Sequence, residues 1–299
     1  MANELSVAVL GPGGVGGLLA ALLSRAGHRV TCLAGDDTAA TLRTRGIEVR
    51  SGHFGDFTAE VDADTTLRTP VDAVLITVKH TALDAALSRL PAESLGDALL
   101  VPFLNGVEHP ATLRAVHRPD RIAPGVIRVE STRVAPGVIE HASPFAEIDL
   151  TGDQVPRPRL DALAQALTAA GPATRVLPDE TAALWAKMAF LAPFALLTTR
   201  YALPLGEVRT RHRDELAALV AETAAVSQAC GAPADPARAL ARYDAFPPAT
   251  KSSMQRDAEA GRPLELDAIG GALLRAAERH GVPVPVAARV VRELADATR

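Results

Sequence analysis

The sequence contains very few lysines. Among its 31 basic residues only Lys79, Lys187 and Lys251 are lysines, and the others are arginines. An arginine guanidinium keeps its proton in proteins, whereas a lysine ammonium gives it up where burial or neighbouring charges lower its pKa. Each lysine position is therefore informative about chemistry. Lys187 is the most unusual of the three, because it interrupts the apolar stretch ALWAKMAFLAPFALLTTR.

Cysteine is also scarce, and positive charge is not in surplus. Cys32 and Cys230 lie far apart with no cluster of His or Cys around either, so we expect reduced thiols and no metal site. The net charge is -4 and the isoelectric point is about 6.1. This balance argues against a general nucleic-acid-binding protein, which needs basic residues to neutralise phosphates.

Long apolar runs and a targeting leader are lacking as well. Because Lys187 interrupts the longest candidate, no run of about eighteen uncharged apolar residues occurs, and we expect no membrane span. The first residues, MANELSVAVLGPGG, show no basic leader followed by an apolar block. We therefore expect a cytoplasmic protein.

Strand and helix patterns alternate in the first part of the chain. Alternation of this kind predicts right-handed crossovers and a mostly parallel sheet with helices on both faces, which is a doubly wound, Rossmann-like α/β fold. Lys79 and Asn105 are expected at the ends of the third and fourth strands. The four expected strands are at 6–10, 29–34, 71–79 and 98–106.

From about residue 121 the pattern changes. Segments at 125–141 and 146–152 predict strands added antiparallel to the sheet, and a helix at 159–171 and a strand at 173–178 close the domain. Beyond this point strand patterns almost vanish, and helical patterns follow one another with Pro and Gly at the breaks. We therefore predict a Rossmann-like domain at 1–178 and an all-helical domain at 179–299.

The glycines after the first strand form the pattern G-x-G-x-x-G. Gly11 allows a tight turn, Gly13 lets a pyrophosphate approach the backbone, and Gly16 lets the helix pack on the strand. With Gly14 and Val15 they open a helix whose first N–H groups are available to an anion. The alternative is a Gly-rich turn that binds nothing, but the position after the first strand favours a dinucleotide.

The sequence leaves the type of dinucleotide open. An acidic residue at the end of the second strand would bind the ribose of NAD, and an arginine there would favour NADP. Asp36 and Asp37 come slightly late for the first role, and Arg43 and Arg45 come later still.

Lys187 has two possible roles. If its segment is helical, the lysine is surrounded by Trp185, Met188, Leu191 and Phe194. Its stem can lie along the apolar surface with the ammonium in water. Alternatively, a partly desolvated ammonium can act as the proton donor that a carbonyl oxygen needs when the carbonyl carbon receives a hydride.

A second polar group lies around an expected helix break at 261–263. Ser252, Ser253, Glu265 and Asp267 flank this break. A hydroxyl there can bind a substrate carboxylate, and a carboxylate can orient the lysine. The alternative is helix capping by serine and a solvated glutamate.

Six segments carry a specific pattern, namely GPGGVG, TVKHTALDAAL, FLNGVEHPATL, LWAKMA, SSMQRD and ELDAIGGALLRAAERHGVPVP. Together they resemble the ketopantoate reductase (2-dehydropantoate 2-reductase) family across essentially the whole chain. The resemblance implies NADPH-dependent reduction of a 2-oxo acid to a 2-hydroxy acid, with a Rossmann domain, a helical domain and the active site between them.

The resemblance also implies roles for five residues. Lys187 resembles the general acid, and Glu265 the acid that orients it. Ser253 resembles the residue that binds the substrate carboxylate. Asn105 resembles the asparagine that contacts substrate and nicotinamide, and Lys79 the lysine beside the cofactor. Two of the three lysines thus fall where the family is expected to use lysine chemistry.

The chain also departs from the family pattern. Leu191 and Ala195, which we expect beside Lys187 on its helix face, occupy positions that are commonly Asn, and Leu205 and Gly270 occupy positions that can be Asn. A substrate pocket without these amides discriminates less well for a hydroxylated substrate. Ala34 stands where the resemblance places an arginine for NADPH.

We therefore expect an NADPH-dependent oxidoreductase that reduces 2-dehydropantoate, and NADH stays open as cofactor. One alternative is a relative that reduces a more apolar 2-oxo acid, a ketone or an imine. Another is an NADPH-binding sensor without turnover. For partners we expect a small-molecule carbonyl substrate and neither nucleic acid nor membrane, with a homodimer as a candidate assembly.

Overall fold

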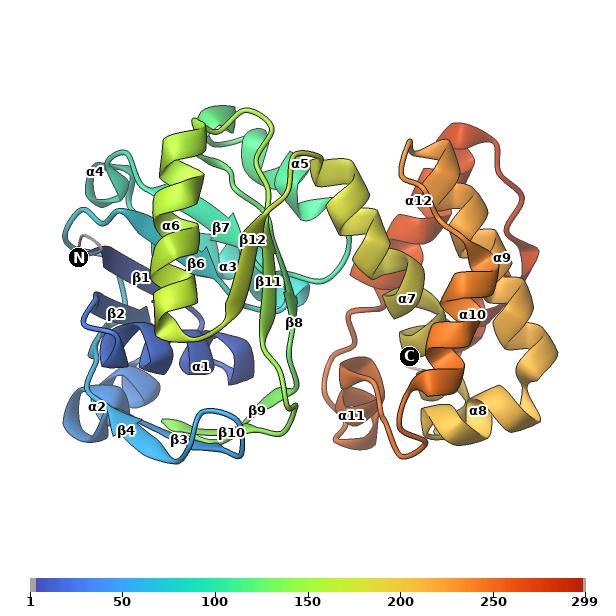
Figure 1. Ribbon diagram of the computed structural model, residues 1–299, viewed down its shortest axis with the longest axis horizontal. Helices are drawn as coiled ribbons and strands as arrows, with labels where there is room; N and C mark the ends of the chain where they lie inside the picture. Colours follow the sequence, from blue (N-terminus) through green and yellow to red (C-terminus); the bar gives the residue numbers. More distant parts are fainter. Residues whose placement is uncertain (1–3, 298–299) are drawn as a thin grey trace. The chain divides into compact units, whose positions relative to one another are not determined.

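The computed structural model describes residues 4–297 and divides the chain into two compact units (Figure 1). The first unit holds the chain up to Leu104 together with His109–Glu180. The second holds Asn105–Glu108 and the chain from Thr181 onward. The boundary expected at residue 178 lies two residues before this division. The segment Asn105–Glu108, which begins within the fourth expected strand, was not predicted to belong to the second unit.

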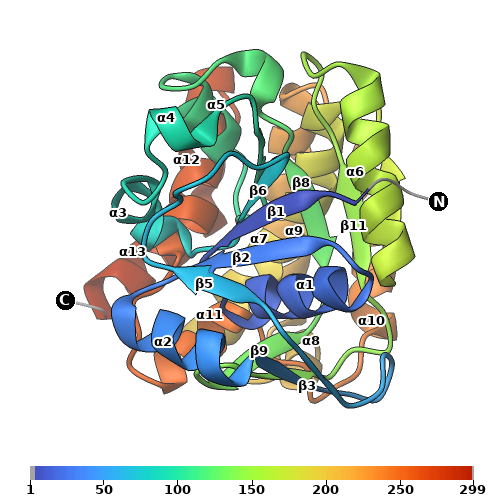
Figure 2. The ribbon, with the colours of Figure 1, turned by 90° about the vertical axis from the view of Figure 1, so that its left-hand side faces the viewer.

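The first unit is built on a five-stranded sheet in the order β5-β2-β1-β6-β7, of which Figure 2 shows β5, β2, β1 and β6. Every neighbouring pair in this sheet is parallel. The order is that of a doubly wound dinucleotide-binding half, as the alternating pattern predicted. The strands are β1 (Ser6–Leu10), β2 (Arg29–Leu33), β5 (Asp62–Asp64), β6 (Ala73–Ile76) and β7 (Leu99–Pro102).

Helices cover both faces of this sheet. Val7 and Val9 point into a cluster with α1 and α6, whereas Ala8 and Leu10 point into a second cluster with α3 and α5. Successive residues of a strand face opposite sides, so a strand covered on both sides is apolar throughout. On the first face lie α1 (Gly14–Arg25), α2 (Asp36–Arg45) and α6 (Arg157–Ala170); on the second lie η1 (His80–Ala82), α3 (Leu83–Leu87), α4 (Ala92–Leu95) and α5 (His109–Arg114).

Two strands end earlier than the sequence predicted. β6 ends at Ile76, three residues before Lys79, and β7 ends at Pro102, three residues before Asn105. The last paired residue of β1 is Leu10, which lies opposite Ile76. Because the chain turns away at Gly11, no partner strand continues beside β6 beyond this point.

The later strands do not extend the main sheet, contrary to the prediction. They form a sheet in the order β4-β3-β10-β9 and another in the order β12-β11-β8. Only some pairings are antiparallel, since β10 pairs with β3 and β11 with β12 in parallel. The strands are β3 (Ile47–Ser51), β4 (Phe57–Ala59), β8 (Gly125–Arg128), β9 (Ser131–Ala135), β10 (Val138–His141), β11 (Glu147–Leu150) and β12 (Ala173–Val176), and η2 (Pro119–Arg121) precedes β8.

Within the described residues the second unit is helical, and its breaks lie at the predicted Pro and Gly positions except for one at His212. One element was not anticipated, a π-helical turn η3 (Asp267–Gly271) between Glu265 and α12. The helices are α7 (Glu180–Tyr201), α8 (Leu205–Arg211), α9 (Arg213–Ala229), α10 (Pro236–Ala245), α11 (Ser253–Glu259), α12 (Ala272–His280) and α13 (Pro285–Ala297).

Helix α7 is the central element of this unit and runs through Pro193 as one helix. By length and composition it is apolar enough to cross a membrane in spite of Lys187, and 61% of its most apolar window is buried within the protein. Its residues Ala192 and Phe194 to Leu197 belong to the core of the unit, together with Leu219 of α9 and Leu273 of α12. A buried core helix of a soluble protein has the same composition.

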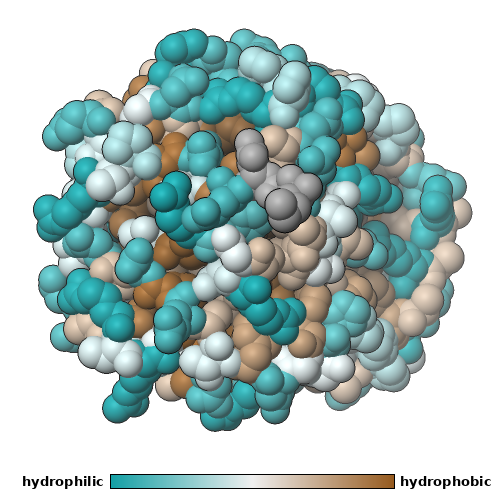
Figure 3. Space-filling model, turned by 60° about the vertical axis from the view of Figure 1, so that its left-hand side comes forward, coloured by the Kyte–Doolittle hydropathy of each residue, from teal (hydrophilic) through white to brown (hydrophobic). Residues whose placement is uncertain are grey.

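The surface is mainly polar on the face shown in Figure 3. Hydrophilic residues cover most of this face, and hydrophobic residues show in the gaps between them. The exposed large apolar side chains within residues 4–297 are Val116, Val134 and Phe145, all from the first unit.

Candidate active site

The glycine loop connects β1 to α1 in the first unit. Gly11 has φ +87°, a left-handed conformation that favours glycine. A Cβ at Gly11 would lie 2.5 Å from Cγ1 of Val78, and one at Gly16 would lie 2.2 Å from Oγ1 of Thr77. These two glycines therefore allow the loop and the first helical turn to lie directly on the residues that follow β6.

Gly13 is different from its two neighbours in the motif. A Cβ at Gly13 would meet no protein atom closer than the carbonyl oxygen of Gly11 at 3.9 Å. The backbone at this point is therefore open, and the first N–H groups of α1 have no carbonyl one turn earlier to bond. An open backbone at a helix N-terminus fits a dinucleotide pyrophosphate. Gly14 and Val15 are the first two residues of that helix.

Lys79 directly follows two residues that contact this loop. Thr77 donates its hydroxyl to the carbonyl oxygens of Leu10 and Gly11, at 3.1 and 2.8 Å, and Val78 contacts Gly11. Lys79 follows at once and begins the short helix η1 with its carbonyl accepting from the amide of Ala82 at 2.9 Å. Its side chain is exposed. The ammonium group is thus attached next to residues that contact the glycine loop.

An arginine from a distant segment of the chain lies at the end of β2, and the sequence did not indicate it. Arg89 donates from Nη1 to the carbonyl oxygens of Ala34 and Thr65, at 2.9 and 2.7 Å. It therefore brings a positive charge to the strand end where Ala34 stands in place of the expected arginine. Only the fold could reveal this, because 55 positions separate Arg89 from Ala34.

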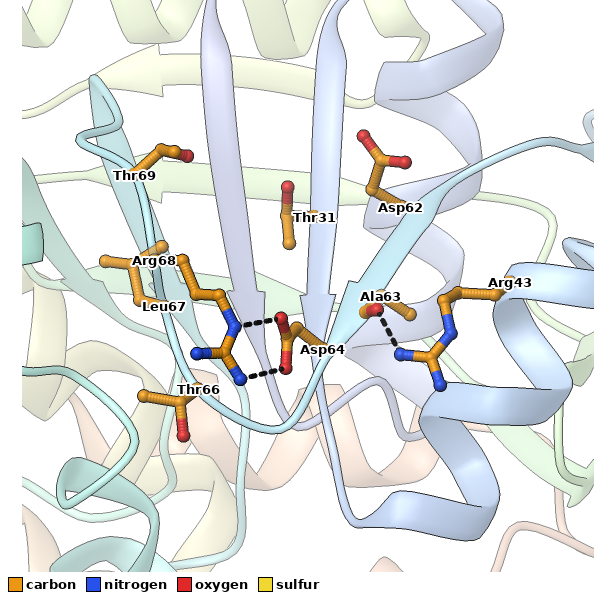
Figure 4. A pocket seen from close by; sticks show the side chains of 9 residues that line it. All are labelled: Thr31, Arg43, Asp62, Ala63, Asp64, Thr66, Leu67, Arg68 and Thr69. Carbon is orange, nitrogen blue, oxygen red and sulfur yellow. Dashed lines mark hydrogen bonds and ion pairs between the residues drawn. The ribbon is translucent and has the colours of Figure 1, made fainter.

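A pocket of about 240 Å³ lies beside this strand end, between β2, β5, α2 and the loop after β5 (Figure 4). Both of its arginines are engaged there. Arg43 donates to the carbonyl oxygen of Ala63 at 3.0 Å, and Arg68 pairs with Asp64 at 2.7 Å. Hydrogen bonding from Arg68 lowers the pKa of Asp64 to about 2. Arg43 thus ties α2 to the edge strand β5 through the carbonyl oxygen of Ala63.

The predicted general acid belongs to the second unit. Lys187 lies in the first half of α7 and is half-buried. The same helix reaches two other predicted regions, since Leu196 packs at Gly270, and Thr198 is 2.8 Å from Ser252 between their hydroxyl oxygens. Helix α7 therefore connects the lysine with both the SSMQRD segment and the π-helical turn.

The positions that depart from the family pattern are packed with apolar atoms. Ala195 and Leu205 are fully buried, and Leu191 is half-buried. A Cβ at Gly270 would lie 2.5 Å from Cγ2 of Val291, so an asparagine there would have to displace the Val291 side chain. These positions therefore offer neither amide groups nor, at Gly270, the room for one.

The two serines of the SSMQRD segment have different environments. Ser252 is buried and caps α11, because its hydroxyl accepts from the amide of Gln255 at 3.0 Å. Ser253, which we expect to bind the substrate carboxylate, is the first residue of the helix and is exposed. The capping alternative therefore describes Ser252 and leaves the hydroxyl of Ser253 accessible.

Asn105 and Glu265 meet in the second unit. The side-chain amide of Asn105 donates to Oε2 of Glu265 at 2.9 Å, and only 7% of Glu265 is exposed. The glutamate directly precedes the helical turn that leads into η3, and its carbonyl oxygen accepts from the amide of Ile269 at 3.1 Å. The structure thus joins two of the predicted residues that come from distant segments of the chain.

Thiol and metal chemistry have little support among the described residues. Burial raises the pKa of Cys32 to about 12, which keeps this thiol protonated, and burial also raises the pKa of Cys230. Within residues 4–297 no group of three or more His, Cys, Asp or Glu is placed to hold a metal ion.

Comparison with known proteins gives the family of this chain. The family profile "Ketopantoate reductase PanE/ApbA" matches residues 7–150, and "Ketopantoate reductase PanE/ApbA C terminal" matches residues 179–297. The chain belongs to the ketopantoate reductase family. The first matched region covers most of the Rossmann-like unit together with the segment 105–108, and the second covers the helices from 179 onward.

Individual proteins match nearly the whole chain. The 2-dehydropantoate 2-reductase of Caulobacter vibrioides is 31% identical over 296 residues, covering 96% of this chain and 97% of that protein. The uncharacterised oxidoreductase YkpB of Bacillus subtilis is 29% identical over 296 residues, with 96% of each chain covered. The crystal structure of 2-dehydropantoate 2-reductase from Geobacter metallireducens GS-15 has a TM-score of 0.89 at 29% identity, covering 98% and 100% of the two chains.

Membership of the ketopantoate reductase family makes the chain a pyridine-nucleotide-dependent oxidoreductase. The features of the two units are consistent with this chemistry. One unit has an open glycine loop that can hold a dinucleotide, and the other has a half-buried lysine, a buried glutamate bonded to an asparagine, and an exposed serine hydroxyl. Such groups can hold a carboxylate and a carbonyl and can transfer a proton.

Proposed function

We propose that the protein reduces a 2-oxo acid to a 2-hydroxy acid with NADPH, and that 2-dehydropantoate is its substrate. The observation that carries this proposal is the hydrogen bond between Asn105 and Glu265 on the helix-rich unit that also holds Lys187. The names of the relatives support the substrate, because several of them are 2-dehydropantoate 2-reductases.

Each residue has a distinct role in the proposed reaction. The reduced nicotinamide, when bound, supplies the hydride to the carbonyl carbon. Lys187 donates a proton to the carbonyl oxygen as negative charge develops there, a step that typically contributes about 10² to 10⁴ in rate. Glu265 orients the lysine. Asn105 and Ser253 hold the substrate, and Ser253 binds its carboxylate.

NADPH is the cofactor that we propose, with Gly11, Gly13 and Gly16 shaping the pyrophosphate loop and Lys79 beside it. Arg89 supports NADPH, because it places a guanidinium at the carbonyl of Ala34, where a 2′-phosphate needs positive charge. The exposed carboxylates of Asp36 and Asp37 at the start of α2 disfavour a 2′-phosphate, because they carry the same sign of charge. Dissociation constants for NADPH and NADH, measured by fluorescence of the reduced nicotinamide, test this choice directly.

A second candidate substrate is a more apolar 2-oxo acid. Ala195 and Leu205 are fully buried in the core of the helical unit, whereas Leu191 is half-buried on the helix that carries Lys187. A site with Leu191 in place of an amide has fewer partners for the hydroxyl of 2-dehydropantoate. An apolar 2-oxo acid such as 2-oxoisovalerate has no such hydroxyl, so it loses no hydrogen bond in an apolar site.

The first experiment compares kcat/KM for 2-dehydropantoate and 2-oxoisovalerate with NADPH, followed by the nicotinamide absorbance. A value of about 10⁴ M⁻¹s⁻¹ or more for 2-dehydropantoate, and a clear preference for it, is expected for a reductase of this substrate. Preference for 2-oxoisovalerate would replace the first candidate by the second. Tight NADPH binding with no turnover of any 2-oxo acid would instead favour the non-catalytic sensor.

A further inference from the structure

A guanidinium group ties together three segments of the second unit next to Glu265. Arg275, on α12, donates from Nη2 to Oε2 of Glu108 at 2.7 Å and from Nη1 to Oδ1 of Asp267 at 2.7 Å. Its Nη2 is also 3.2 Å from the carbonyl oxygen of Asp267. One side chain thus joins the segment Asn105–Glu108, the first residue of η3, and α12.

The segment Asn105–Glu108 is fixed at both ends. At one end the amide of Asn105 bonds Glu265, and at the other end the carboxylate of Glu108 bonds Arg275 through both of its oxygens. Between them Gly106 has φ +89°. A Cβ there would lie 2.3 Å from the carbonyl oxygen of Ala268, so the segment lies directly on the π-helical turn.

The same guanidinium also fixes the other partner of the hydrogen bond. Glu265 lies two residues before Asp267, and its carbonyl oxygen accepts from Ile269 within the turn that Arg275 holds. π-Helical turns are rare in proteins, and those that occur frequently lie at functional sites. Arg275 therefore restrains the backbone on both sides of the contact between Asn105 and Glu265.

We propose that Arg275 is a positioning residue for the reaction, acting through Glu108 and Asp267 to hold Asn105 in hydrogen-bonding register with Glu265. The proposal rests on the proposed function for its kinetic consequence. A displacement of a substrate-holding group by about 1 Å can cost about 100-fold in rate. The long sequence separation of 160 positions between Asn105 and Glu265 makes such register dependent on tertiary contacts.

A purely structural role for Arg275 predicts a different outcome. The side chains of Arg275 and Asp267 are 43% and 71% exposed, and ion pairs this accessible add little to folding stability. Hydrogen bonding with Glu108 and then Asp267 raises the pKa of Arg275, so the guanidinium stays charged at all working pH values. We call the bonds of Arg275 with Glu108 and Asp267 the Arg275 clamp. Loss of this clamp is therefore expected to change kcat/KM far more than the unfolding midpoint.

The test compares Arg275→Met, Arg275→Lys and the matched control Arg279→Met. Arg279 lies one turn later on α12 and approaches Oε1 of Glu108 only to 3.9 Å. For each variant kcat and KM for the 2-oxo acid, the dissociation constant of NADPH and the unfolding midpoint are measured. We expect Arg275→Met to lose at least about tenfold in kcat/KM with cofactor binding retained. Arg275→Lys should recover part of this loss, because lysine keeps the charge without the fork geometry.

Kinetics of Arg275→Met equal to those of Arg279→Met would overturn the proposal. So would a loss of activity that is matched by a loss of cofactor binding or of folded protein.

Hydrogen exchange of the amides in residues 105–108 separates this proposal from the proposed function. Faster exchange is expected in Arg275→Met and not in Arg279→Met, even for a protein with no detected turnover. Unchanged protection in this segment would refute the clamp, whereas absence of turnover in the wild type would count against the proposed function alone.

Discussion

Asn105 donates its side-chain amide to the carboxylate of Glu265 at 2.9 Å, and 160 positions separate the two residues in the chain. Replacement of Asn105 by Asp would place a second carboxylate against a buried one. Like charges raise the pKa of one member of such a pair. An acid whose pKa is raised by folding binds more protons in the folded state, so the variant should lose stability as the pH rises.

Urea unfolding at about pH 5 and about pH 8 measures this slope. Asn105→Ala is the control, because it removes the hydrogen bond without adding charge. It should cost about 1.5–3 kcal/mol, the usual worth of a hydrogen bond to a charged group. The interpretation fails if the Asp and Ala variants show the same difference between the two pH values.

Substitution of Lys187 by Met tests its role as the proton donor. The stem of Met fills the same half-buried space on α7, so folding and cofactor binding should persist while kcat falls by about 10² or more. Lys187→Arg should also be slow, because arginine keeps its proton. Steady-state kinetics with saturating NADPH measure both variants. Near-normal turnover in either one would remove Lys187 from the mechanism.

The glycine loop offers a matched pair of substitutions. Gly16→Ala places a Cβ 2.2 Å from Oγ1 of Thr77 and 2.5 Å from the carbonyl oxygen of Gly11, and overpacking of this kind costs about 1–3 kcal/mol. Gly13→Ala meets no protein atom within 3.9 Å. The first variant should unfold at lower temperature, and the second should fold normally yet bind NADPH more weakly. Normal cofactor affinity in a folded Gly13→Ala protein would place the dinucleotide elsewhere.

A buried histidine gives a pH dependence that is unrelated to the reaction. His141 bonds Ser51 at 2.8 Å through Nδ1 and Ser143 at 3.0 Å through Nε2. Burial lowers its pKa below the ordinary value of 6.5, and the charge of nearby His53 acts in the same direction. Because the pKa of His141 is lower in the folded protein than in the unfolded chain, the unfolded chain binds this proton more readily. Its contribution to stability is therefore present above pH 6.5 and is lost as the pH falls below that value.

Thermal unfolding between about pH 7.5 and about pH 5.5 tests this expectation, since most carboxylates stay charged over that range. His141→Gln should be less stable overall and should show a shallower decline on acidification. An unchanged decline in the variant would assign the effect to another group, such as His117, whose pKa burial also lowers.

Much of the fold follows from local sequence patterns. The first strand, the glycine loop and α1 were predictable because turn chemistry and apolar periodicity act within a few residues. The ends of β6 and β7 were not, since β6 stops where its neighbour β1 turns away at Gly11. The separate small sheets were missed for a similar reason, because β3 and β10 pair in parallel although they lie far apart in the chain.

The site divides in the same way. Lys187 and the glycines stand out by residue type, and resemblance to a family supplied Ser253 and Glu265. Arg89 and Arg275 have no distinguishing feature in a chain whose basic residues are mostly arginine. Their partners at Ala34 and Glu108 are brought to them only by tertiary structure. The bond between Asn105 and Glu265 likewise depends on where the segment after β7 packs.

The assignment of Asn105–Glu108 to the helical unit affects how the two units can be recombined. A fragment that begins at Thr181 lacks this segment. Glu265 then loses its hydrogen bond from Asn105, and Arg275 loses its bonds to Glu108. A chimera that joins one relative's first half to another's second half at Glu180 would combine the segment Asn105–Glu108 of one protein with the Arg275 and Glu265 positions of the other. Exchange of activity between relatives therefore requires these four residues to be transplanted with the C-terminal part.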